Sequence, residues 1–138
     1  MRNTVYSEKG GTGVYKKSVP EKLLNDILIK VEKKYDTHFP FKIRGIVISE
    51  HLIAATLEIL NDEKTKTLPQ NARHDNSRNT PDGLDKRLKI RMRSDTCRGH
   101  IVSDILSDIG VVNIYKIKNF KTGKLLNATQ LIPEYSWG

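Results

Sequence analysis

Residues 61–85 limit what this chain can fold into more than any other segment. These twenty-five residues contain Leu68, Ala72 and Leu84 as their only apolar members, beside two prolines and many Asn, Asp, Ser and Thr. A segment with so few apolar side chains contributes little to a hydrophobic core, and structureless loops of this length are uncommon in compact domains unless they carry function. We therefore predict a long polar loop at 61–85, with the ordered fold built from the residues on either side.

On both sides of this loop, apolar residues recur with the spacing of helices and strands. A period of 3.6 residues predicts three helices, over 18–39, 49–60 and 94–109, the last capped by Ser94 or Thr96. Strands are expected around the glycine turn of 4–16, over 41–48, and as a hairpin of 111–120 with 124–132. With a further strand at 86–93, the order is β-β-α-β-α-(long loop)-β-α-β-β. The sequence predicts a single α+β domain over 1–138, with a mixed or antiparallel sheet and about three helices.

The segment 86–93 alternates between apolar and basic residues. Leu88, Ile90 and Met92 fall on one side of an extended chain, and four cations fall on the other, namely Arg87, Lys89, Arg91 and Arg93. Alternation with a period of two is typical of a half-buried strand. We therefore expect a strand here, with a row of cations on its exposed face.

The positive charge of the chain is concentrated in its middle. The whole chain carries a net charge of +8, and residues 64–100 hold ten Lys and Arg against four Asp, which gives +6. Six of the ten cations are Arg, whose planar donor fork suits phosphate groups and guanine edges. The sequence therefore predicts a small basic protein that contacts nucleic-acid phosphates through residues 73–98. The expected contacts are Arg73, Arg78, Arg87, Lys89, Arg91, Arg93 and Arg98. An acidic protein surface is the alternative partner, and a plain solvated face is the third interpretation.

Two further functions remain open from the sequence. A basic domain without a catalytic motif also fits a phage or mobile-element inhibitor that docks on a host enzyme. A metal-independent endoribonuclease needs a general base, a general acid and cations around the phosphorane, and His74, His100 and Arg91 are its candidates. The element order, with a hairpin at 111–132, resembles that of compact toxin ribonucleases of the barnase and colicin type. That resemblance includes no catalytic motif, and the sequence favours a binding protein over an enzyme.

Cysteine usage and hydropathy set the remaining expectations. The single Cys97 excludes an internal disulfide framework and any multi-cysteine zinc site, so we expect no metal and no cofactor. The chain has no stretch approaching the ~20 apolar residues of a membrane span. These features predict a cytoplasmic protein without membrane partners, and they leave homo-oligomer formation open.

Overall fold

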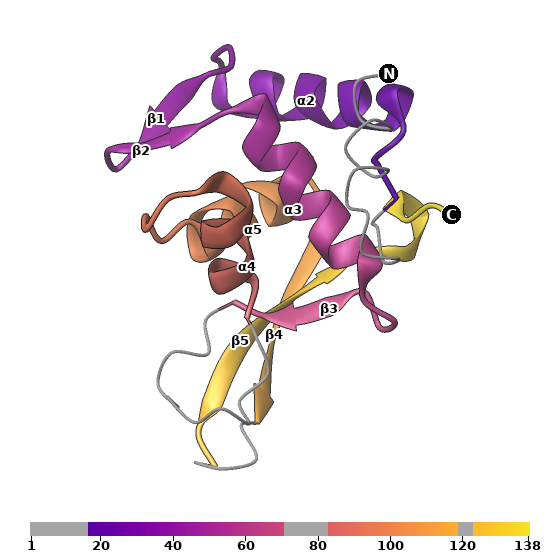
Figure 1. Ribbon diagram of the computed structural model, residues 1–138. Helices are drawn as coiled ribbons and strands as arrows, with labels where there is room; N and C mark the ends of the chain where they lie inside the picture. The colour runs from indigo at the N-terminus through magenta and orange to yellow at the C-terminus, as the bar shows by residue number, and fades with distance from the viewer. Residues whose placement is uncertain (1–16, 71–82, 119–122) are drawn as a thin grey trace.

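The computed structural model describes residues 17–70, 83–118 and 123–138 (Figure 1). These residues contain four helices, five short strands and one 3-10 turn. In chain order they are α2 (Glu21–Tyr35), β1 (Phe41–Ile43), β2 (Ile46–Ile48), α3 (Glu50–Asp62), β3 (Thr67–Pro69), α4 (Leu84–Met92), α5 (Gly99–Asp108), β4 (Val112–Lys118), β5 (Leu125–Leu131) and the turn Pro133–Tyr135. All strand pairs are antiparallel, which confirms the predicted α+β class. The strands expected within 4–16 lie outside the described residues.

Helix α3 lies at the centre of the hydrophobic core. It begins after Ser49, whose hydroxyl accepts a hydrogen bond from the Leu52 N–H at 3.1 Å, a standard N-cap. Its apolar residues Leu52, Ile53 and Leu57 are completely buried. Helices α2 and α5 and the three-stranded sheet pack around it, so the helices predicted from 3.6-residue spacing form the core as expected. Each helix in the described ranges falls short of the length and apolarity that crossing a membrane requires.

The segment 41–48, predicted as one strand, is instead a tight hairpin. β1 and β2 pair with each other from Phe41 opposite Ile48 to Ile43 opposite Ile46. The two residues between them, Arg44 and Gly45, both have positive φ values, 50° and 80°. A two-residue hairpin turn requires this left-handed backbone, which glycine adopts without strain. The continuous apolar run therefore concealed a reversal of the chain.

The second sheet has the strand order β3-β5-β4. The predicted C-terminal hairpin is confirmed, with seven registered pairs from Val112 opposite Leu131 to Lys118 opposite Leu125. Its third strand, β3, lies inside the segment predicted as a loop and places Leu68 opposite Thr129.

The prediction of a loop over all of 61–85 is thus wrong at both ends. Helix α3 continues to Asp62, β3 occupies 67–69, Gln70 is buried, and α4 begins at Leu84. Leu68 and Leu84, two of the three apolar residues of this segment, both belong to the core. A short strand needs only backbone pairing and one inward side chain, so a polar segment can supply it. Residues 71–82 lie outside the described part of the chain.

The segment 86–93 forms a helix, not a strand. Leu84 and Leu88, one helical turn apart, are both fully buried, whereas Ile90 is 67% exposed. The alternating pattern had placed Ile90 on the inner side with Leu88. Lys, Arg, Leu and Met all have good helix propensity, and the spacing of Leu84 and Leu88 is helical once the segment is extended backward. The row of four cations on one strand face therefore does not exist.

Candidate functional site

Three of the four cations predicted on the strand are ion-paired within the protein. Arg87 Nη1 lies 2.5 Å from Glu63 Oε2, and Lys89 Nζ lies 3.7 Å from Asp85 Oδ2. Arg91 Nη2 pairs with Glu58 Oε1. The acidic partners of Arg87 and Arg91 come from α3 and its end, so the charge that the sequence concentrates in 64–100 is partly neutralised by residues before it. Most of the α4 cations therefore stabilise the fold.

The Arg91 pair is the most enclosed of the three. Glu58 is 7% exposed, and its second carboxylate oxygen accepts the Val19 N–H at 2.9 Å. One carboxylate thus joins α3, α4 and the chain leading into α2. Because a guanidinium held by a buried carboxylate is not free to meet a phosphate, Arg91 is a poor candidate for either the nucleic-acid contact or the catalytic role.

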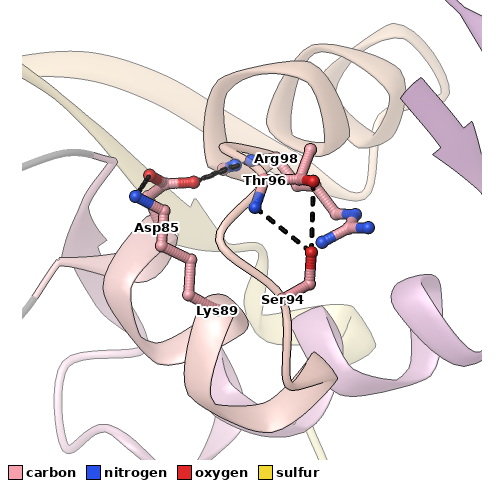
Figure 2. Close-up of polar contacts among 6 residues, drawn as sticks. Asp85, Lys89, Ser94, Thr96 and Arg98 are labelled. Atoms are coloured by element: carbon pink, nitrogen blue, oxygen red, sulfur yellow. Dashed lines mark hydrogen bonds and ion pairs between the residues drawn. The ribbon is translucent and has the colours of Figure 1, made fainter. Parts of the chain in front are cut away.

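A continuous chain of hydrogen bonds joins the hairpin to the start of α5. The Gln70 N–H donates to the Asn127 carbonyl on β5 at 2.8 Å, and the Asp85 N–H donates to the Gln70 carbonyl at 2.9 Å. The Asp85 carboxylate, 5% exposed, then accepts the N–H groups of Arg98 at 2.7 Å and Gly99 at 2.9 Å (Figure 2). An acidic group at a helix N-terminus satisfies free backbone donors and complements the helix dipole. Asp85 therefore caps α5 from the neighbouring helix.

This cap replaces the one predicted from sequence. Neither Ser94 nor Thr96 caps α5, which begins at Gly99 with Arg98 as its N-cap residue and no side-chain cap of its own. The Ser94 hydroxyl instead accepts the Thr96 N–H at 3.2 Å and lies 3.1 Å from the Thr96 hydroxyl (Figure 2). The two hydroxyls meet within the turn 93–98 that connects α4 to α5.

Close packing beneath the cap fixes the position of α5. A Cβ added at Gly99 would lie 3.0 Å from the Gln70 carbonyl oxygen, so any larger residue would push this backbone away by a few tenths of an ångström. The buried Ser103 hydroxyl donates to the Gly99 carbonyl at 2.6 Å and lies 2.7 Å from the Thr129 hydroxyl. Gln70 Nε2 also donates to the Thr129 hydroxyl, at 3.2 Å. The sheet, Gln70 and the start of α5 are therefore held as one unit.

The turn 93–98 carries two arginines that differ from those of α4. Arg93 is exposed and ends α4 in a left-handed conformation with φ 53°. The Arg98 guanidinium has buried Nε and Nη1 atoms with no hydrogen-bond partner among the described residues. In Figure 2 its side chain leaves the start of α5 and runs back over the turn that carries Ser94 and Thr96. We call Arg93, Ser94, Thr96 and Arg98 the turn site.

Lys89 approaches the same turn from α4. Its pKa is raised above the ordinary lysine value, first by a hydrogen bond with the Cys97 thiol and then by the charge of Asp85. Lys89 is therefore cationic at neutral pH, with two partners that hold it beside the turn. The thiol of Cys97 serves here as a contact of Lys89.

The remaining predicted residues are distributed as follows. Arg73, Arg78 and His74 lie outside the described residues. His100 is exposed in the first turn of α5, and its side chain makes no hydrogen bond or ion pair with any other described residue. Within 17–70, 83–118 and 123–138, no group of three or more His, Cys, Asp or Glu side chains is arranged to hold a metal ion.

Sequence reasoning missed the two residues that organise this region, Asp85 and Gln70. Asp85 counted only as a charge, and Gln70 fell inside the predicted loop. The spacing of Asp85 and Lys89 was an available signal, because residues four apart pair on a helix but not on a strand. Comparisons with protein-family models, with characterised proteins and with solved structures give no match to this chain. Its function is therefore inferred from the chemistry of the residues themselves.

Proposed function

We propose that this protein binds nucleic acid through its phosphate backbone, at the turn site and the arginines of the adjoining segment 71–82. The observation that carries the proposal is the Arg98 guanidinium, whose buried nitrogens have no partner among the described residues. Guanidinium nitrogens buried without an acceptor are unfavourable, and Arg98 as a whole is only half-buried, so part of its side chain is open to a ligand. A phosphate group supplies both the charge and the acceptor oxygens that Arg98 lacks.

The surroundings of Arg98 support a phosphate ligand. Arg93 adds a second cation on the same turn, and the Ser94 and Thr96 hydroxyls add neutral donors of the kind that contact phosphate oxygens. The net charge of +8 favours a polyanion over a single small phosphate compound, since a polyanion gains from every cation that it passes.

The anchoring of residues 70 and 83 supports a contribution from Arg73 and Arg78. Gln70 is bonded to Asp85, which in turn caps the start of α5. Gly83 is buried at the start of α4. The chain therefore leaves and re-enters the described structure next to the turn site.

Fluorescence anisotropy with labelled DNA and RNA oligonucleotides, as single strands and as duplexes, tests the proposal. We expect binding at low salt whose affinity falls steeply as salt rises, with a logarithmic slope of about 0.7–0.9 for each phosphate contacted. Arg98→Gln is expected to weaken binding about tenfold and to lower the slope by about one. Lys33→Gln is the matched control, because it removes one exposed cation from α2, outside the turn site.

The stability of Arg98→Gln separates a ligand contact from a structural one. Since its buried nitrogens have no partner in the described structure, the substitution should leave the urea midpoint unchanged or raise it. A large loss of stability, or an equal loss of affinity in Lys33→Gln, contradicts the proposal. Absence of binding to every oligonucleotide at low salt also contradicts it, and a stoichiometric acidic protein partner would then support the inhibitor alternative.

A further inference from the structure

The outer half of the β4–β5 hairpin extends away from the helices as a two-stranded ribbon (Figure 1). None of the described residues in 113–118 and 123–127 is buried. At the inner end of the hairpin, by contrast, Val112 of β4 and Leu131 of β5 are buried in the core. A ribbon exposed on both faces adds little to the core. Natural hairpins are shortened or covered unless they are used, because exposed strand pairs invite unwanted association.

The charged residues of the ribbon all have the same sign. Residues 109–133 contain four lysines, Lys116, Lys118, Lys121 and Lys124, and no Asp or Glu. The nearest acids lie just outside this range, at Asp108 in α5 and at Glu134. Lys116 and Lys118 point to the same face of β4, and their cross-strand neighbours are Asn127 and Leu125. No acidic side chain stands opposite either lysine, so this face is complementary to a polyanion.

We infer that this ribbon enters the major groove of double-stranded DNA, an inference that rests on the proposed nucleic-acid binding. The three outer pairs, from Lys116 with Asn127 to Lys118 with Leu125, extend about 10 Å along the strands, and two strands lie about 5 Å apart. The major groove of B-DNA is about 12 Å wide and 8.5 Å deep and accepts a two-stranded β-ribbon. The corresponding groove of an RNA duplex is too narrow for side chains to enter.

The side chains on this face fit the two kinds of contact that a groove requires. Lys116 and Lys118, both on β4, provide phosphate contacts on that side of the ribbon, which helps to fix its position. Asn127 is exposed and offers the amide that pairs with adenine, and Leu125, 63% exposed, offers an apolar contact for a thymine methyl group. Single strands fit less well, since they bind to rows of aromatic residues and Tyr115 is the one aromatic residue in the described part of the ribbon.

The ribbon and the turn site lie on one connected structure. Asn127 accepts the Gln70 N–H, and Gln70 leads through Asp85 to Arg98. The ribbon face with Lys116 and Lys118 is also the face that carries Thr129, which touches α5 through Ser103. The ribbon and the turn site are therefore held in a fixed position relative to each other.

Competition and anisotropy measurements with the full chain test this inference. We expect a DNA duplex to bind at least tenfold more tightly than an RNA duplex of the same sequence. Lys116→Gln with Lys118→Gln should weaken DNA binding at least tenfold and lower the salt slope by about two. The control is Lys33→Gln with Lys34→Gln, which removes two exposed lysines from α2. Bulky 5-substituted pyrimidines, which fill the major groove, should also weaken binding, whereas a minor-groove competitor should not.

The outcomes separate this inference from the proposed function. Equal binding of duplex RNA, or equal loss in the ribbon variant and the α2 control, overturns the groove assignment while binding that depends on Arg98 still stands. Loss of DNA binding in the ribbon variant but not in Arg98→Gln supports the ribbon as the DNA contact and contradicts the proposed role of the turn site. No binding to any nucleic acid overturns both, and an acidic protein that requires Lys116 and Lys118 would then account for the ribbon.

Discussion

The substitution Asp85→Ala tests whether one buried carboxylate holds the start of α5 and, with it, the turn site. Asp85 Oδ1 accepts the N–H groups of Arg98 and Gly99 at 2.7 and 2.9 Å, and its Oδ2 faces Lys89 at 3.7 Å. Alanine removes all three contacts and leaves the buried Gly99 N–H without its acceptor. Asp85→Asn is the matched comparison, because an amide oxygen still accepts both backbone hydrogen bonds.

The expected cost follows from these contacts. A buried donor left unpaired costs about 1–3 kcal/mol, and loss of a helix cap costs about 0.5–2 kcal/mol. The pair with Lys89 adds little, since that side chain is 35% exposed and solvent screens the interaction. We therefore expect Asp85→Ala to lower the free energy of unfolding by about 2–4 kcal/mol, and Asp85→Asn by about 1 kcal/mol. For a chain of this size, the first corresponds to a fall in Tm of about 10 °C.

Urea unfolding followed by far-ultraviolet circular dichroism measures both variants, with exposed Glu134→Gln as a control that should not change the midpoint. An Asp85→Ala variant that loses less than about 1 kcal/mol at an unchanged m-value would show that the carboxylate is not the cap. A loss in Asp85→Asn as large as in Asp85→Ala would show that charge, rather than an acceptor in the right place, holds the helix.

Two further predictions concern pairs that the sequence did not reveal. Glu58→Gln should destabilise the protein by about 1–3 kcal/mol in urea unfolding, because Arg91 loses its counter-charge. Arg91→Gln should also lower stability but leave the salt slope of DNA binding unchanged. A reduced salt slope in Arg91→Gln would instead make Arg91 a phosphate contact. The pKa of Tyr35 is raised by burial and then by its hydrogen bond to Asp108, so its contribution to stability is complete below about pH 10 and declines as the pH rises above it. Tyr35→Phe should therefore reduce the loss of urea midpoint between about pH 8 and pH 11, and an unchanged loss would contradict the raised pKa.

The sequence predicts the elements whose side chains face one continuous core. The apolar residues of α3 are buried because the helix is surrounded by the other elements, and the inner ends of β4 and β5 join the same core through Val112 and Leu131. The prediction failed at α4, where the pattern of residues 86–93 fits both a strand and a helix. Leu84, outside the window, decided in favour of the helix by packing beside Leu88.

The sequence predicts which residue types the candidate site contains, but not how the fold arranges them. Counting charges identified an arginine-rich segment, but not which arginines would be neutralised from α3. Glu58 and Glu63 lie more than twenty residues before Arg87 and Arg91, so their pairing depends on how α3 and α4 pack. The hydrogen bonds of Gln70 and Asp85 likewise join residues whose meeting is set by the tertiary fold. Arg98 was among the predicted contacts, but only the structure distinguishes it from its paired neighbours.

The single hydrogen bond between the Asp85 N–H and the Gln70 carbonyl has a consequence for sequence divergence and for engineering. It joins Gln70 and Asp85, which flank residues 71–82 on either side. Once such ends are fixed, doubling the number of residues between them costs only about 0.6 kcal/mol of closure entropy. The fold can therefore accept segments of other lengths and compositions between 70 and 83 without redesign of its core.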